Sequence, residues 1–228
     1  MTDALQKFLF EDLPAIPAYA NKGEIAVGCF SGSTGRPTLR WADFDSTRLV
    51  NGKADRPFKL LTDVKYAPEL RATGETPIAA AINWAVEALD KRVAARVEER
   101  WSREFLPTIV LITDGEPTKG QDLDGVGRML AARAFGANAD FLFYALGVEQ
   151  ANDQIMERLA PGAYFPLRGM TMERLLKFVA ASLGIVTGPV GGEPEQAAPL
   201  DMSPTRSYAN RTEYARLRDY VNTFAGYE

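Results

Sequence analysis

The chain of 228 residues contains no histidine and a single cysteine, Cys29. Without histidine, Ser-His and Cys-His nucleophilic mechanisms and histidine-ligated metal sites are all excluded. One cysteine cannot form a disulfide within the chain, which is typical of a protein from a reducing compartment. Any metal ion must therefore be bound by oxygen atoms, and oxygen ligands favour a hard cation such as Mg²⁺, Mn²⁺ or Ca²⁺.

Long apolar runs and an excess of one charge are also missing. No stretch approaches the roughly 20 apolar residues that span a bilayer, and residues 1–12 lack the uninterrupted apolar segment of a signal peptide. The formal net charge is −4, with basic and acidic residues interleaved, which argues against nucleic-acid or anionic-membrane binding. These features predict a cytoplasmic protein that binds neither nucleic acid nor membrane.

Sequence motifs of nucleotide-dependent enzymes are not found. No G-x-G-x-x-G leads from a predicted strand into a helix, and no G-x-x-x-x-G-K-[ST] occurs. Cys29 lies in a run predicted to be a buried strand, where a reactive thiolate is not expected. The sequence therefore favours a protein that is not an enzyme, and a nucleotide-dependent enzyme on a Rossmann-like sheet is the least favoured alternative.

Apolar runs alternate with amphipathic segments along most of the chain. The runs at 24–30, 106–112 and 139–148 predict buried strands, and 38–44 predicts an edge strand antiparallel to the first. The other predicted elements are helices at 3–12, 77–103, 122–135, 151–159 and 171–184, and a short last strand at 163–167. This order predicts an α/β fold, a three-layer, doubly wound, mostly parallel sheet with one antiparallel edge strand.

The composition divides the chain into three parts. Residues 1–186 are predicted to form the α/β domain, in which 46–75 is mostly an irregular, polar loop. Residues 187–209 are rich in proline and glycine and have the composition of a linker. Residues 210–228 regain helical periodicity and predict a C-terminal helix that docks on the domain or binds a partner.

Two residues with oxygen donors stand at predicted ends of elements. Thr76 precedes the helix that starts at Pro77, and Asp114 follows the strand 106–112. In a doubly wound sheet both positions lie on one rim, and a hydroxyl and a carboxylate are ligands that a hard cation accepts. Two local alternatives stay open, namely that Thr76 is a plain N-cap with Pro77 at N1 and that Asp114 is a turn residue before glycine.

Two motifs carry a resemblance to a known family. Residues 111–118, LITDGEPT, and residues 72–79, ATGETPIA, resemble the von Willebrand factor A domain, and are closest to its bacterial branch typified by the tellurite-resistance TerY proteins. The resemblance covers most of residues 3–186 and does not cover 187–228. It implies the three-layer sheet of that family and a metal-ion-dependent adhesion site.

The resemblance also assigns roles to residues. It implies that Thr76 and Asp114 supply the threonine and aspartate ligands of a magnesium ion. A partner protein's Asp or Glu carboxylate often completes the metal shell in the family, so the resemblance implies protein binding without catalysis. It further implies a bacterial stress-response or tellurite-resistance setting, with kinase- or phosphatase-like proteins among the expected partners.

The chain departs from the family at its start. The helix at 3–12 matches the family's first helix, which follows the first strand and its DxSxS metal loop, and neither precedes it here. Ser31-Gly-Ser33 follows what matches the second strand and cannot substitute. Loss of a central strand would leave several buried backbone groups unpaired at about 1–3 kcal/mol each, which is comparable with a total stability of about 5–15 kcal/mol.

Two expectations follow from that departure. The first is that Met1 is an internal methionine of a longer reading frame. The second applies if the chain is taken literally: its first central strand is missing, only two family ligands remain, and metal affinity is weak or nil. An alternative function is then a structural or assembly role with a vestigial metal site.

Overall fold

Two units make up the chain in the computed structural model. The first comprises Met1–Trp101, Gly115–Asp122 and Met170–Ala180, and the second comprises Ser102–Asp114, Leu123–Gly169 and Ala181–Glu228. The structure describes residues 2–20, 23–33, 35–51, 57–70, 74–98, 107–114, 116–136, 139–148 and 150–187. The predicted linker from 188 onward and the predicted C-terminal helix at 210–228 therefore lie outside the described residues.

The first unit opens with a helix whose geometry changes halfway. The α-helix α1 (Thr2–Lys7) continues as a π-helix, η1 (Phe8–Asp12), and a short helix α2 (Pro17–Ala20) follows. Leu5, Phe8 and Leu9 are buried on one side, as an amphipathic helix requires. The helix predicted at 3–12 is confirmed, and only its switch to π geometry is new.

Five short strands of the first unit pair antiparallel. They are β1 (Glu24–Ile25), β2 (Gly28–Ser33), β3 (Arg36–Ala42), β4 (Leu49–Asn51) and β5 (Lys59–Leu60). They form one sheet in the order β2-β3-β4 and a second sheet from β1 and β5. The register of β2 and β3 runs from Gly28 opposite Trp41 to Ser33 opposite Arg36. The antiparallel pairing predicted for 24–30 and 38–44 is confirmed.

One prediction for this unit is wrong in detail. The run at 24–30 is not one buried strand, because β1 and β2 belong to different sheets and Cys29 is only half-buried. Gly28 has no side chain to cover the sheet, and the rings of Trp41 and Trp84 stack at 3.7 Å beside it. The described part of 46–75 is mostly irregular, as predicted, and contains β4, β5 and the 3-10 helix η2 (Leu61–Asp63).

The long helix of the first unit is α3 (Ile78–Glu98), which packs against β2 and β3. Its apolar stripe, Ile78, Ile82, Val86 and Leu89, is buried, as the spacing of three and four residues predicts. Its predicted continuation to residue 103 lies outside the described residues.

The charged half of α3 is bonded to β1. The Arg92 guanidinium donates to both carboxylate oxygens of Glu24 at 2.6 and 2.7 Å, and Arg96 pairs with the same carboxylate. Burial alone raises the pKa of Glu24, but the hydrogen bonds and charges of Arg92 and Arg96 outweigh it, so the pKa lies below its ordinary value. This pairing ties the helix to a strand 68 residues earlier in the chain.

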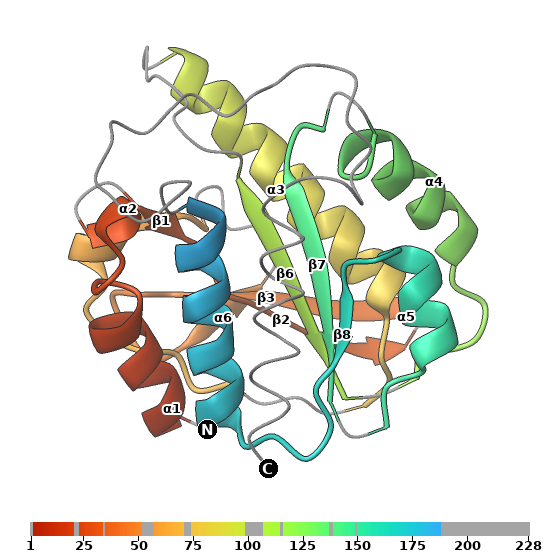
Figure 1. The fold of residues 1–228 in the computed structure, drawn as a ribbon, viewed down its shortest axis with the longest axis horizontal. Coiled ribbons are helices and arrows are strands. Elements are labelled where there is room, and N and C mark those ends of the chain that lie inside the picture. The colour runs from red at the N-terminus through yellow and green to blue at the C-terminus, as the bar shows by residue number, and fades with distance from the viewer. Residues whose placement is uncertain are drawn as a thin grey trace. The chain divides into compact units, whose positions relative to one another are not determined.

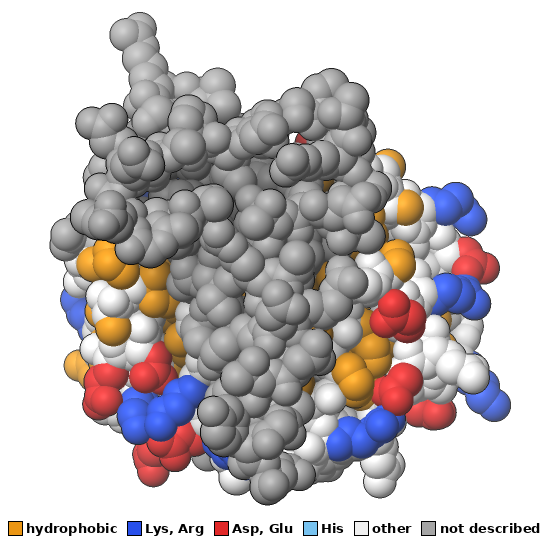
Figure 2. Space-filling view, in the orientation of Figure 1, with side chains coloured by type: hydrophobic (Ala, Val, Ile, Leu, Met, Phe, Trp, Pro, Cys, Tyr) orange, Lys and Arg blue, Asp and Glu red, His pale blue; other side chains and the backbone are white. Residues whose placement is uncertain are grey.

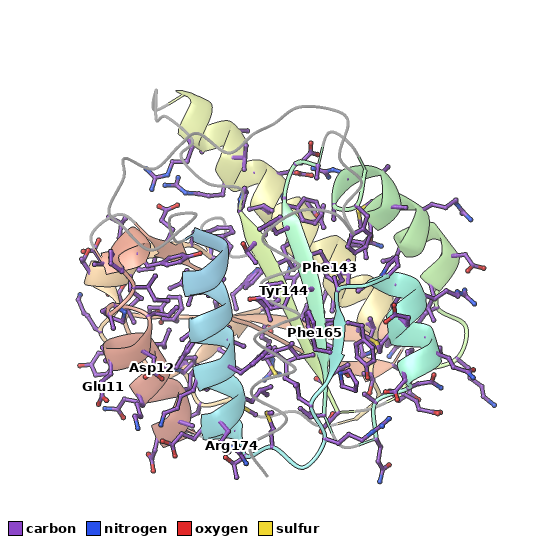
Figure 3. All side chains as sticks on the ribbon, in the orientation of Figure 1. Glu11, Asp12, Phe143, Tyr144, Phe165 and Arg174 are labelled. Atoms are coloured by element: carbon purple, nitrogen blue, oxygen red, sulfur yellow. The ribbon has the colours of Figure 1, made fainter. Side chains whose placement is uncertain are left out.

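The second unit contains a parallel sheet. Its strands β6 (Thr108–Thr113), β7 (Leu142–Gly147) and β8 (Tyr164–Pro166) pair in that order. Every residue of β7 is buried, which is typical of the middle strand of a parallel sheet. Figure 3 labels Phe143 and Tyr144 on this strand, whose side chains point to opposite faces because they are neighbours.

Two helices accompany this sheet. They are α4 (Leu123–Arg133) and α5 (Asp153–Leu159). The two helices pack on each other, and α5 also contacts β7 and β8 (Figure 1). All three strands and both helices fall where the sequence predicted them, within a few residues at each end.

The last described helix is α6 (Met172–Thr187), of which Met172–Ala180 belongs to the first unit. Leu175, Phe178 and Val179 are buried, and Lys7 pairs with Glu173 at 2.9 Å. No described helix is long and apolar enough to cross a membrane.

The fold class is α/β, as predicted, with helices and both parallel and antiparallel sheets. The described strands form three separate sheets. Their arrangement in one doubly wound sheet of three layers therefore stays a prediction. Acidic and basic side chains lie next to one another on the described surface in Figure 2, in line with the interleaved charges of the sequence.

Candidate functional site

The loop that carries Thr76 is fixed to the end of β2. Gly32 and Gly74 form an isolated parallel bridge, and the Glu75 amide donates to the Gly32 carbonyl at 2.9 Å. Both glycines have positive φ, +92° and +97°, a region that residues with a Cβ rarely adopt. A Cβ on Gly32 would also lie 2.6 Å from the Arg36 carbonyl oxygen. Glycine at both positions therefore allows the loop to reach the strand.

Thr76 is bonded through its backbone to Thr118. Its amide donates to the Thr118 hydroxyl at 2.9 Å, and its carbonyl accepts from the Thr118 amide at 3.1 Å. The two residues are 42 positions apart in the sequence. This reciprocal pair fixes the Thr76 loop to the segment that follows TDGEP, and both partners belong to the first unit.

Gln121 completes this network with one side chain. Its Nε2 donates to the carbonyls of Thr76 and Thr118, both at 2.8 Å, and its Oε1 accepts from the Ala79 amide at 2.7 Å. Ala79 lies in the first turn of α3, where backbone amides have no partner within the helix. The acceptor that caps this turn is thus Gln121, and the N-cap role considered for Thr76 is not what the structure shows.

Asp114 lies in the second unit, directly after β6. The Val148 amide donates to the Thr113 carbonyl at 2.9 Å and the Gln150 amide donates to the Asp114 carbonyl at 3.3 Å. The backbone at Asp114 is therefore bonded to the loop after β7, while its side chain is exposed. Among the described residues, no cationic side chain is paired with this carboxylate.

The two predicted ligands belong to different units, and the structure describes each within its own unit. They are related through the sequence, because Thr118, which is bonded to Thr76, follows Asp114 by four residues. A hydroxyl and an exposed carboxylate are the types of ligand that a hard cation binds. Mg²⁺ takes about six oxygen ligands, however, and these two residues supply only two. In the described part of the chain, no group of three or more His, Cys, Asp or Glu side chains is placed to hold a metal ion.

Sequence reasoning missed the two residues that fix the loop. Thr118 is the last letter of the TDGEPT motif, so its position was visible but its role was not. Gln121 gives no local signal, because a side chain that caps a helix 42 residues earlier has no characteristic spacing.

A second polar cluster lies at the end of the parallel sheet. The carboxylate of Asp153 accepts from the Tyr164 hydroxyl and from Arg168, both at 2.6 Å. Burial, and then the hydrogen bond to Asp153, raises the pKa of Tyr164, and the same bond and that of Arg168 lower the pKa of Asp153. These bonds join the start of α5 to β8 and to the loop after it, which is a structural role.

Comparison of the chain with models of known protein families, with curated proteins and with solved structures gives no match. The resemblance to the von Willebrand factor A domain therefore rests on the sequence motifs, chiefly those around Thr76 and Asp114. What the geometry adds is the hydrogen-bond network of Thr76, in which one motif is bonded to the last residue of the other, Thr118, and to Gln121 just beyond it.

Proposed function

We propose that this chain is a non-catalytic protein-binding module that contacts an Asp or Glu of a partner protein through a divalent cation. Thr76 and Asp114 are the protein ligands in this proposal, and Mg²⁺ is the favoured ion. The observation that carries it is the network at Thr76. The segment that begins with Asp114 also contains Thr118 and Gln121, which bond to both backbone groups of Thr76.

The chemistry of the donors supports a bridging cation. Asp114 offers an exposed carboxylate, and Thr76 offers a neutral hydroxyl, both of which are hard oxygen donors. A cation bound by so few protein ligands keeps coordination positions for water and for a carboxylate from another protein. Its charge attracts that carboxylate, whereas the Asp114 carboxylate alone would repel it.

The wider proposal follows the resemblance. The alternation of strands and helices supports a doubly wound, three-layer sheet formed by residues 1–186, and the parallel order β6-β7-β8 fits one half of it. A bacterial stress-response or tellurite-resistance setting, with kinase- or phosphatase-like partners, belongs to the same proposal. It rests on the motifs TDGEPT and GETP alone.

The proposal is tested by titrating Mn²⁺, as a paramagnetic substitute for Mg²⁺, into the full chain and following free Mn²⁺ by electron paramagnetic resonance. We expect weak binding to the wild type and at least a tenfold loss in Asp114→Asn, which keeps the shape of the side chain and removes its charge. Asp3→Asn is the control, because Asp3 is an exposed carboxylate of α1. Equal Mn²⁺ binding by the wild type and Asp114→Asn would refute the assignment.

One observation favours a second function. Only two protein ligands are assigned, fewer than a closed magnesium site uses, which suits a structural or assembly role with a vestigial site. The two functions differ in whether the wild-type chain is expected to bind a divalent cation. A wild-type chain that binds no Mn²⁺ at millimolar concentration supports the assembly role.

A further inference from the structure

Gln121 uses all of its amide groups on two backbone segments of the first unit. A glutamine side chain has two N–H donors and one carbonyl acceptor. The donors bond to the carbonyls of Thr76 and Thr118, and the acceptor bonds to the amide of Ala79. One side chain therefore bonds three backbone groups on two segments.

These bonds fix the backbone of Thr76. Its amide is bonded to the Thr118 hydroxyl, and its carbonyl accepts from Thr118, from Gln121 and from the Ile78 amide. Pro77 follows, and a residue before proline is restricted to extended backbone. Within the described part of the chain, the hydroxyl is the one polar group of Thr76 that no residue bonds.

We propose that Thr118 and Gln121 are positioning residues, which fix the backbone of Thr76 so that its hydroxyl is presented to a cation that they do not touch. This inference rests on the proposed function for the ligand that Thr76 contacts. The fixed backbone itself is independent of any ligand. Residues that orient a metal ligand from outside the metal shell commonly change affinity by 10–100-fold when they are replaced.

The variants are chosen to remove single hydrogen bonds. Gln121→Glu keeps the size of the side chain but replaces two donors with carboxylate oxygens that face two carbonyls, so it repels them. Thr118→Val keeps the shape and loses the hydroxyl that accepts from Thr76. Thr118→Ser keeps that hydroxyl and is the conservative variant expected to restore function.

Two controls separate positioning from general loss of stability. Gln154→Glu makes the same chemical change at an exposed position of α5. Asn152→Ala removes the cap of α5, in the second unit, and lowers stability without touching the Thr76 loop. Both are expected to bind Mn²⁺ as the wild type does.

The experiment combines a metal-free and a metal-dependent measurement on the full chain. Amide hydrogen exchange, followed by NMR without metal, is expected to be about tenfold faster at Thr76 in Thr118→Val and at Ala79 in Gln121→Glu, because each amide loses its acceptor or the geometry of its bond. Mn²⁺ affinity, measured by electron paramagnetic resonance, is expected to fall about tenfold in both variants. Thr118→Ser should return both values close to those of the wild type.

Two results would overturn the inference. Unchanged exchange at Thr76 and Ala79 would show that the two residues do not fix the loop. Faster exchange with unchanged Mn²⁺ affinity would show that they stabilise the loop without positioning a ligand. A wild type that binds no Mn²⁺ would instead contradict the proposed function, and the exchange measurement would still decide whether Thr118 and Gln121 fix Thr76. If Gln121→Glu fails to fold, Thr118→Val tests the same claim.

Discussion

The starts of helices α3 and α5 are capped in opposite ways. In α5 the cap is local, because the Ile155 amide donates to the Asn152 side chain at 3.1 Å, three residues away. In α3 the Ala79 amide donates to Gln121, 42 residues away. A local cap forms as soon as its helix forms, whereas a distant cap exists only when the chain around it has folded. The distant cap also joins the segment that contains the motif at 72–79 to the segment that follows the motif at 111–118.

The same contrast extends to the ion pairs of the two helices. The second half of α3 is tied to Glu24 through Arg92 and Arg96, across 68 and 72 residues. The start of α5 is tied through Asp153 to Tyr164 and Arg168, across 11 and 15 residues. Helix α5 thus depends on its neighbours in the sequence, and α3 depends on the folded first unit.

The largest effect is expected at a close contact between β7 and β8, where Tyr164 also bonds to Asp153 at the start of α5. In Gly147→Ala the new Cβ would overlap the Tyr164 hydroxyl oxygen. Overpacking typically costs about 1–3 kcal/mol, and a displaced Tyr164 also loses its bond to a carboxylate, at about 1.5–3 kcal/mol. We expect a loss of about 3 kcal/mol in the free energy of unfolding by urea denaturation.

Two further variants make this prediction specific. Gly127 lies in α4 with no atom within 4 Å of an added Cβ, so Gly127→Ala should stabilise by up to about 1 kcal/mol. Tyr164→Phe removes the atom nearest to the new Cβ, and the double variant with Gly147→Ala should lose less than the sum of the two single losses. A Gly147→Ala protein as stable as the wild type would mean that Tyr164 moves without cost.

The intermediate effect compares the two caps directly. Asn152→Ala should cost about 1 kcal/mol, the usual value for losing an N-cap. Gln121→Ala should cost about 2 kcal/mol, because it removes three hydrogen bonds to the backbone, one of which caps the Ala79 amide. Urea denaturation measures both losses. Equal losses, or a larger one for Asn152→Ala, would contradict the view that the distant cap stabilises more.

The smallest effect is a change in pH dependence. The folded pKa of Glu24 lies below its ordinary value of 4.5 because of Arg92 and Arg96. A carboxylate of this kind contributes stability that is fully present above its unfolded pKa and is lost as the pH falls through its folded pKa. Thermal unfolding from pH 7 to pH 3.5 should therefore show a shallower loss below about pH 4.5 in Glu24→Gln than in the wild type. If the melting temperatures of the wild type and Glu24→Gln fall in parallel with pH, the pairing of Glu24 with Arg92 and Arg96 adds no pH-dependent stability.

Periodicity and composition predicted much of the fold. The buried stripe of α3 and the apolar run of β7 were visible because burial repeats with the period of the element. The division of 24–30 into β1 and β2 was not visible, because the partner of β1 is β5, some 35 residues later, and pairing depends on which edge is available. The motif containing Asp114 indicated a site, but gave no information on how Thr76 is bonded.

The sequence by itself determined the types of chemistry that are available: oxygen donors without histidine, one cysteine, helices and strands in alternation, and two motifs at the ends of predicted elements. Only the tertiary structure decided that Gln121 caps α3, that Thr118 and Thr76 bond reciprocally, and that Glu24 pairs with two arginines. The physical reason is that periodicity encodes burial along a single element, whereas a hydrogen bond between distant residues depends on the position of both in space.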